Sequence, residues 1–589
     1  MQTPSFSEAV SLIRRNEIGR GAAIETPFGR RLLCYADLTA TGRYLHLVER
    51  WIRRLQPFYA NTHTAVSSTG RIMSELREEA RRVIGRSVNA GPDDVVLFVG
   101  AGATAAVNKL VGLLGFRISD ALEREHGLNR QIPENQRPVV FVGPYEHHSN
   151  ELPWLESVAD VVEVDLDASG RIDISDLTNK LKRFSSRALK VGAFSAASNV
   201  TGVLTDVRAV TRALHQQGAY ASFDYAAAAP YLPIDMHPSE SESIDALVLS
   251  THKFMGGPSG SGILVAHRKL FRCQSPERPG GGTVDYVAAF EKVAVDYAHR
   301  LDEREEGGTP AIVSDIRAGL AFLVREMVGP QRILEHELRM SEQAVRRLAR
   351  HPKIQVLGPI QLPRLAILSF NVEGLHHDLV SALLDHLFGI QNRAGCSCAG
   401  PYGHRLLQID RHKSELYRKQ IARGILGIKP GWVRLSLPYY ASQKDLEFIF
   451  KAVEFVADHG MDFVPAYCLG WLDGVWRYPD RSPAPLQRPP LDLDALSQLA
   501  FETGSEIESE EPISDEALEA ERARYFDEAH RISSELRSRW AVEHPCWNVP
   551  TGRPEIDQLI WFKYVLCDQP FGAQAAANPV KREAAAGPS

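Results

Sequence analysis

Apolar and polar positions alternate in a regular rhythm from about residue 95 onwards. Short runs rich in β-branched residues end in Gly, Ser or Asp, and helical stretches such as Thr104–Leu114 follow them. This rhythm is typical of a mainly parallel sheet covered by helices on both faces. The predicted strands are Val95–Gly100, Val139–Gly143, Val161–Asp167, Lys190–Ser195, Tyr220–Asp224, Ala246–Ser250 and Gly262–Ala266. We therefore expect one large α/β domain with a seven-stranded sheet.

The pattern changes after this sheet. Residues 311–351 are predicted to form a long amphipathic helix, and Leu365–Val372, a helix near Asp378–Leu387 and Trp432–Leu437 indicate a smaller α+β domain. Ser442 and Asp445 form a capping-box pattern that opens a last helix, Leu446–Ala457. The expected division is an N-terminal segment (1–40), a large domain (41–345), a small domain (346–465) and a C-terminal extension (466–589).

The extension has a composition of its own. Between Pro479 and Pro490 five of twelve residues are proline, and Glu502–Glu521 carries nine acidic and no basic residues. These stretches predict a linker and an acidic segment. Beyond them one apolar stripe recurs at helical spacing, formed by Leu518, Tyr525, Ala529, Ile532, Leu536 and Trp540. We expect this helical tail to dock on the rest of the protein.

Composition excludes several classes of function. The chain of 589 residues is 44% hydrophobic and 24% charged, as in ordinary globular proteins. Its formal charge of −6 argues against a nucleic-acid binder. No stretch approaches the ~18 apolar residues of a membrane span. The seven cysteines are an odd, sparse set that predicts a reducing compartment, and we expect a cytoplasmic protein.

The strongest chemical signal is Lys253. The strand Ala246–Ser250 leads into Thr251, His252 and Lys253 and then a glycine-rich loop. A lysine that is partly buried there can react as a free amine with an aldehyde cofactor, although a surface lysine is the plain alternative. Asp224 ends another strand and could hold a pyridine nitrogen protonated, unless it only caps a turn.

A glycine-rich turn, Gly100-Ala-Gly-Ala-Thr104, follows the first strand and opens a helix. Backbone N–H groups at such a helix start can hold a phosphate, together with the Thr104 hydroxyl. The turn lacks the third glycine of a dinucleotide fingerprint and the lysine of a P-loop. It therefore gains meaning only in combination with Asp224 and Lys253.

Five motifs in order carry a family resemblance. They are the glycine-rich turn, Glu146-His-His-Ser-Asn150, Ser198-Asn199-Val-Thr-Gly202, Asp224, and Ser250-Thr-His252-Lys253. Over roughly residues 30–460 the chain resembles the class V aminotransferase-like superfamily, which depends on pyridoxal 5'-phosphate (PLP), and above all its cysteine desulfurase and selenocysteine lyase branch. The resemblance implies the fold-type I PLP transferase fold and a homodimer.

The resemblance also implies roles for single residues. Lys253 would form the Schiff base with PLP, Asp224 would pair with the pyridine nitrogen and His147 would stack on the ring. The cofactor phosphate would contact Gly102, Ala103, Thr104, Ser250, His252 and, from a neighbouring subunit, Thr309 of the Glu305-Glu-Gly-Gly-Thr309 segment. The amino-acid substrate would contact Asn199, Arg393, Arg434 and His63, with Arg434 clamping its carboxylate.

A cysteine loop, Asn392-Arg-Ala-Gly-Cys396-Ser-Cys398-Ala-Gly-Pro, lies in the expected small domain. Cys398 matches the persulfide-forming cysteine of desulfurases, and nearby Arg393 would contribute positive charge. Three other interpretations remain open: two small buried thiols, a redox-sensitive pair, or half of a metal site completed by His404. A single trailing histidine does not complete a tetrahedral zinc site, so no metal is predicted.

The chain departs from the usual desulfurase pattern in three places. Ala227 stands where a glutamine commonly meets the cofactor's phenolic oxygen, and Ala105 replaces an acidic residue after the phosphate-binding threonine. An insertion also separates Cys398 from Arg434: residues 405–429 hold seven Lys or Arg against two acids. The insertion predicts a solvated surface helix, with a lid or partner dock as the alternative.

The expected function is conversion of cysteine or selenocysteine to alanine, with the sulfur carried as a persulfide on Cys398 and passed to a possible acceptor protein. Two alternatives stay open. One is another class V reaction, such as C–S lysis, epimerisation or transamination, without a persulfide. The other is a catalytically silent, partner-binding protein. All three predict neither a nucleic-acid nor a membrane partner.

Overall fold

The computed structural model describes residues 4–62, 64, 66–290, 294–479 and 513–565. Its largest element is a seven-stranded sheet in the order β4-β10-β9-β8-β7-β5-β6. The strands are β4 (Asp94–Val99), β5 (Val139–Val142), β6 (Asp160–Glu163), β7 (Lys190–Ser195), β8 (Tyr220–Asp224), β9 (Ala246–Ser250) and β10 (Gly262–His267). All seven predicted strands are present, which confirms the predicted α/β class.

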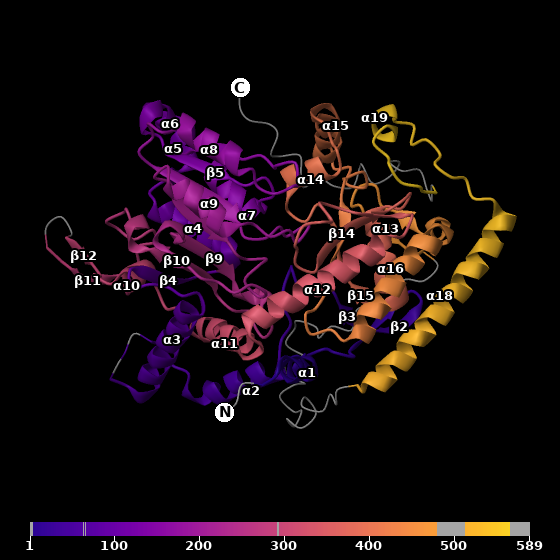
Figure 1. The fold of residues 1–589 in the computed structure, drawn as a ribbon, viewed down its shortest axis with the longest axis horizontal. Helices are drawn as coiled ribbons and strands as arrows, with labels where there is room; N and C mark the ends of the chain where they lie inside the picture. Colours follow the sequence, from indigo (N-terminus) through magenta and orange to yellow (C-terminus); the bar gives the residue numbers. More distant parts are fainter. Residues whose placement is uncertain (1–3, 63, 65, 291–293, 480–512, 566–589) are drawn as a thin grey trace.

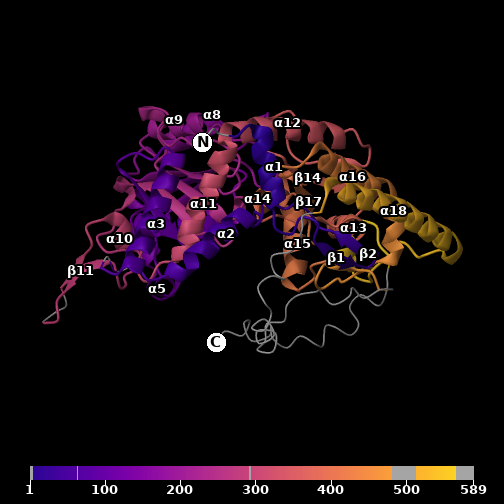
Figure 2. The same cartoon turned by 90° about the horizontal axis from the view of Figure 1, so that it is seen from below.

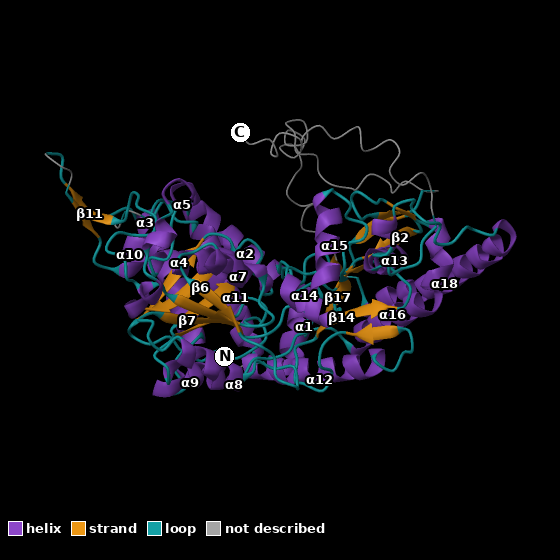
Figure 3. Cartoon of the chain, turned by 90° about the horizontal axis from the view of Figure 1, so that it is seen from above, coloured by secondary structure: helices purple, strands orange, loops and turns teal. Residues whose placement is uncertain are grey.

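The sheet is mostly parallel. Strands β5 to β9 pair in parallel, whereas β10 runs antiparallel to both β9 and β4. Successive side chains of a strand point to opposite faces, so buried neighbours such as Val96 and Leu97 belong to two separate apolar clusters. Helix α4 (Gly102–Leu113) packs in the cluster on one face, and α3 (Ser68–Ser87), α9 (Val207–His215) and α11 (Ile312–Val328) pack in the cluster on the other. Figure 3 shows the strands of this sheet surrounded by helices.

A second, antiparallel sheet has its own core. Its order is β13 (Ile354–Val356), β14 (Ile367–Val372), β17 (Trp432–Ser436) and β16 (Arg393–Gly395). Helices α13 (His377–Phe388) and α16 (Gln443–Phe463) bury their apolar faces in the same cluster. The predicted capping box of Ser442 and Asp445 opens α16, as expected.

The single helix expected over 311–351 is two helices, so that prediction was wrong. α11 ends at Val328, and α12 begins at Pro330 and ends at Leu348. Gly329 between them has φ +94°, a conformation that side-chain-bearing residues rarely adopt, and proline suits the first position of a new helix. The break lets α12 pass from the large sheet to the small one (Figure 1).

The remaining elements are shorter or peripheral. They are α1 (Phe6–Asn16), β1 (Ala23–Thr26), β2 (Gly29–Leu32), β3 (Cys34–Tyr35), α2 (His46–Leu55), α5 (Asp120–His126), α6 (Leu128–Gln131), α7 (His148–Leu155), α8 (Ile174–Arg183), β11 (Val284–Val287), β12 (Val295–Tyr297), α10 (Leu301–Glu305), β15 (Ile390–Gln391), α14 (Gly400–Leu406), α15 (Arg411–Ala422), β18 (Cys468–Leu469), β19 (Trp476–Arg477) and α19 (Pro554–Asp557). The strands β11 and β12 form a hairpin that projects from the large domain (Figure 1).

The predicted tail helix exists as α18 (Asp515–Glu543) and lies along α16 (Figure 2). Leu518, Tyr525, Ala529 and Leu536 of the predicted stripe are buried there. The Tyr525 hydroxyl accepts the backbone N–H of Leu32 at 3.0 Å. The extension is thus part of the second core, as its stripe predicted. The proline-rich stretch and most of the acidic one lie outside the described residues.

Two further expectations can be compared with the described residues. Among the described residues, no helix is both long enough and apolar enough to cross a membrane. Cys34, Cys273, Cys396, Cys398 and Cys546 have free thiols. Cys468 is bonded in a disulfide.

Candidate functional site

A cavity of about 250 Å³ lies between the two sheets, where the parallel strands of the large sheet end. Because parallel strands share one carboxyl edge, the residues that follow β5, β7, β8 and β9 meet there. From the candidates chosen by sequence, the lining contains Gly102, Ala103, Thr104, His147, Asn199, Asp224, Ser250, His252, Lys253, Arg393, Cys398 and Arg434. The motifs, far apart in the chain, thus meet around one space.

One end of the cavity lies at the N-terminus of a helix. Helix α4 starts at Gly102, and its N-cap residue, Ala101, has no side chain that could cap it; the Ala103 N–H donates instead to Ser250 Oγ at 2.8 Å. Thr104 Oγ1 lies 2.7 Å from Ser149 Oγ. Gly102 has φ +60°, and a Cβ there would lie 2.8 Å from His252 Cε1. Free backbone N–H groups and the helix dipole favour a phosphate at this position.

The half-buried Lys253 and the buried Asp224 both line the cavity. Burial lowers the pKa of Lys253 to about 8, although the nearby Asp224 carboxylate opposes this shift. Burial also raises the pKa of Asp224, against the Ala226 N–H that donates to its Oδ1 at 2.7 Å. A neutral amine at Lys253 is therefore accessible near neutral pH, which is the reactive form towards an aldehyde.

His147 faces the same space from the start of α7. Its Nδ1 accepts the Ser149 N–H at 3.1 Å, and burial lowers its pKa to about 3, so the ring is neutral. The preceding residue, Glu146, is buried and is not among the predicted site residues. The Glu146 carboxylate accepts hydrogen bonds from Asn150 and from the Ser195 N–H and hydroxyl. Burial raises the pKa of Glu146 to about 7.

Asp37 organises the arginine side of the cavity. Its Oδ1 accepts from Arg434 Nη2 at 2.8 Å, and its Oδ2 accepts from Arg393 Nε at 3.1 Å. Arg434 Nη1 also donates to the Asn199 carbonyl at 3.0 Å, while its buried Nε finds no partner among the described residues. Asp37 stands outside the five family motifs. An acidic residue directly after the apolar Cys34–Ala36 run was the available signal.

The two loop cysteines differ in their surroundings. Cys398 is exposed and lines the cavity, whereas Cys396 is half-buried against the core of the large domain. A pair of buried structural thiols is therefore the wrong interpretation for Cys398. Within the described residues, Cys396, Cys398 and His404 do not converge into a group that could hold a metal ion.

Of the predicted site residues that the structure describes, Thr309 does not line the cavity. Thr309 is exposed, and its hydroxyl accepts from Asn61 Nδ2 at 3.4 Å. His63 lies outside the described residues. Of the departures from the family pattern, Ala227 lines the cavity close to Asp224, and Ala105 does not. The insertion forms the end of α14 and all of α15, and its Arg405 donates to Glu163, the last residue of β6, at 2.7 Å and to Asp165 at 3.2 Å.

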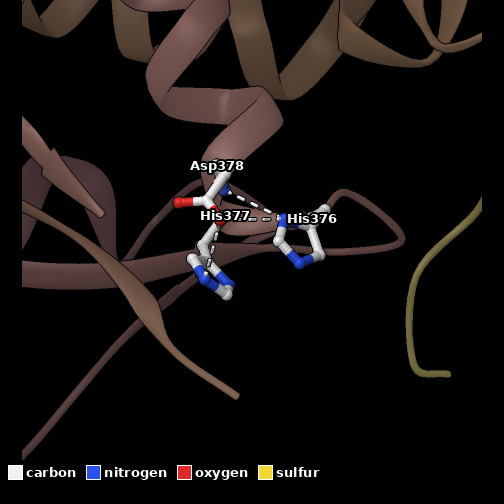
Figure 4. Close-up of side chains that lie close together, drawn as sticks. All are labelled: His376, His377 and Asp378. Atoms are coloured by element: carbon white, nitrogen blue, oxygen red, sulfur yellow. Dashed lines mark hydrogen bonds and ion pairs between the residues drawn. The ribbon is translucent and has the colours of Figure 1, made fainter. Parts of the chain in front are cut away.

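A second group of potential ligands, His376, His377 and Asp378, lies away from the cavity at the start of α13 (Figure 4). His376 Nδ1 already accepts the Asp378 N–H at 3.1 Å and so caps the helix. The two imidazole rings stack 4.2 Å apart, and Trp561 of the extension stacks on His377. Burial raises the pKa of Asp378 to about 6, against the opposing Lys429 charge. We interpret the group as a cap and aromatic stack that holds the extension.

The chain is similar in sequence to known proteins. The family model of class-V aminotransferases matches residues 34–449. A probable cysteine desulfurase of Halalkalibacterium halodurans is 29% identical over 377 residues, which are 63% of this chain and 84% of the relative. One of Streptomyces coelicolor is 28% identical over 375 residues, with the same coverage.

Solved structures show the same fold. An apo cysteine desulfurase from Thermococcus onnurineus superposes with a TM-score of 0.60 at 24% identity, covering 78% of this chain and 99% of that one. A cysteine desulfurase from Escherichia coli superposes with a TM-score of 0.55 at 23% identity, covering 72% of this chain and 94% of that one.

Proposed function

The chain belongs to the class-V aminotransferase family, and from this membership we propose that it is a PLP-dependent cysteine desulfurase. It would convert L-cysteine, or selenocysteine, to L-alanine and hold the released sulfur on Cys398. One observation carries the proposal: the exposed Cys398 opens into the cavity that also contains Lys253 and Asp224. Other class V reactions need Lys253 and Asp224 but have no use for a thiol at this place.

The residues present fit PLP. The uncapped start of α4, with Ser250, His252 and Thr104, would hold the phosphate, and the missing side chain of Gly102 leaves room beside them. Asp224 is a buried acid that would hold a proton at the pyridine nitrogen. When bound, PLP supplies an aldehyde that condenses with amines and a ring that accepts electrons from the substrate α-carbon.

The protein's own groups would then handle substrate and protons. Arg434 would bind the substrate carboxylate through its guanidinium, held in place by Asp37 and by the carbonyl of Asn199. The Lys253 amine, largely neutral above pH 8, would take the α-proton and return a proton to the product. The neutral ring of His147 would cover one face of the cofactor and keep water away.

Sulfur transfer would use the Cys398 thiolate as nucleophile. Its Sγ forms a bond to the substrate sulfur while the substrate Cβ–S bond breaks. Cβ keeps the electron pair of the broken bond and takes a proton, so that cysteine and the Cys398 thiol become alanine and a Cys398 persulfide. Because Cys398 is exposed, an acceptor protein could reach this sulfur without unfolding the loop.

We also propose a homodimer and the domain division given above. Thr309 is exposed and outside this chain's own cavity, as a residue serving a neighbouring subunit would be. The absence of a side-chain hydrogen-bond donor at Ala227 would alter the electronics of the cofactor more than its binding, because it removes one hydrogen bond near the ring and no phosphate contact.

The experiment compares Cys398→Ala with Cys396→Ala in purified, PLP-loaded protein. With L-cysteine as substrate, we expect Cys396→Ala to produce alanine and to carry one extra sulfur on the Cys398 peptide by mass spectrometry. Cys398→Ala should lose both products. Pyruvate and sulfide formation that survives in Cys398→Ala would identify a C–S lyase instead. If Lys253→Ala keeps the colour and the product formation of the wild type, the protein is not a PLP enzyme.

A further inference from the structure

The cysteine loop is attached to the large domain by three hydrogen bonds that all use its backbone. Asn199 Nδ2 donates to the Ser397 carbonyl at 2.8 Å. The His148 N–H donates to the Cys398 carbonyl at 2.9 Å, and the Gly400 N–H donates to His148 Nε2 at 3.1 Å. None of them involves the thiol of Cys398, so Sγ stays free for chemistry.

The loop needs such support. Ser397 and Cys398 have φ values of 50° and 56°, in the left-handed region. For residues with a side chain this conformation costs roughly 1–2 kcal/mol each. Two successive residues of this kind persist only where surrounding contacts hold them. The three hydrogen bonds hold this turn on the large sheet's domain, together with the packing of Cys396 and Ala399 against that domain's core.

His148 contributes two of the three bonds, one from its backbone and one from its ring. The helix that follows the loop, α14, begins at Gly400, and its N-cap residue, Ala399, has no side-chain acceptor. His148 Nε2 supplies the missing acceptor from another domain. A Cβ on Gly400 would lie only 3.2 Å from this nitrogen, so glycine permits the close approach.

The ring of His148 is in the form that this bond requires. An imidazole accepts a hydrogen bond at Nε2 only when that nitrogen carries no proton. His148 is half-buried, and burial together with the Lys429 charge lowers its pKa. Its neighbour His147 uses Nδ1 for a bond within its own helix start and faces the cavity instead. The two adjacent histidines therefore serve different purposes.

We propose that His148 is a positioning residue, which caps α14 across the domain boundary and so holds the Cys398 thiol towards the cavity. Substrate binding by Arg434 does not depend on it, because Asp37 and Asn199 hold that arginine. Loss of the ring acceptor should leave cofactor and substrate binding intact and slow the step that involves Cys398. The kinetic part of this inference rests on the proposed desulfurase function.

The test compares His148→Leu with His148→Gln in the PLP-loaded protein. Leucine removes the acceptor, whereas the glutamine carbonyl reaches a similar position and can accept the Gly400 N–H. For His148→Leu we expect kcat for L-cysteine to fall by about 10- to 100-fold, as for a misplaced reacting group, with KM within about twofold. His148→Gln should stay close to the wild type, and both should keep the visible absorbance of bound PLP.

A second measurement does not need activity. Hydrogen exchange of the peptide that contains residues 396–403 should be about fivefold faster in His148→Leu than in wild type, the effect of one lost hydrogen bond, and normal in His148→Gln. Unchanged exchange in His148→Leu, or equal damage in both variants, would overturn the inference. If exchange rises but Cys398→Ala remains a full desulfurase, the positioning role stands and the proposed function fails.

Discussion

Asp37 and Arg434 form a buried ion pair, 2.8 Å between Oδ1 and Nη2, although 397 positions separate them in the chain. The second carboxylate oxygen of Asp37 holds Arg393. One acid thus fixes both arginines that face the cavity. Removing one partner of a buried pair leaves the other charge unpaired, which is costly.

Asp37→Asn should therefore impair substrate binding more than turnover. We expect KM for L-cysteine to rise at least about tenfold, the loss of one charge-assisted contact, with a smaller change in kcat. Steady-state kinetics measure the changes in KM and kcat, and a thermal melt measures the change in stability. Asp473→Asn breaks an exposed pair with Arg477 and is the control. An unchanged KM in Asp37→Asn would show that Arg434 needs no partner to bind substrate.

The lowered pKa of Lys253 predicts how the apo-protein takes up PLP. Its free amine reacts and its ammonium does not, so the rate of Schiff-base formation should rise with pH and reach half its maximum near pH 8. Asp224 holds this pKa up, so Asp224→Asn should shift the midpoint below 8. Stopped-flow absorbance after PLP addition measures both. A midpoint near the pKa of an exposed lysine, about 10.4, would contradict a buried amine.

Substitution of Gly102 tests whether the phosphate binds at the start of α4. In Gly102→Ala the new Cβ would meet His252 and Ser250, so we expect PLP affinity to fall by at least about tenfold, equivalent to ~1.4 kcal/mol. Gly218→Ala is the matched control, because Gly218 has φ +65° but nothing within 4 Å of an added Cβ. If Gly102→Ala binds PLP as tightly as Gly218→Ala in a fluorescence titration, the phosphate does not bind at the start of α4.

The docked extension should contribute to stability. Tyr525 is 1% exposed in the second core, so Tyr525→Ala should lower the free energy of unfolding by about 3 kcal/mol. Ser534→Ala, on the exposed side of α18, should change it by less than about 0.5 kcal/mol. Urea unfolding followed by circular dichroism gives both values. If Tyr525→Ala unfolds like the wild type, α18 is not part of the cooperative unit.

Local patterns sufficed for much of the fold. The β-branched runs located every strand of the large sheet, because a strand buried on both faces must be apolar along its length. The stripe from Leu518 to Trp540 located α18, because helical spacing gathers those side chains on one face. The hairpin of β11 and β12 escaped prediction, because its strands are only four and three residues long and mostly exposed.

The sequence by itself determined the family motifs and the chemistry that their residue types allow. It named Lys253, Asp224 and Cys398 because each stands in a recognisable local context. Only the tertiary structure decided that Cys398, and not Cys396, opens into the cavity, and that Asp37 and His148 support the site. These roles depend on contacts between segments that lie hundreds of residues apart. No local pattern encodes such contacts, because they arise only when the two sheets pack against each other.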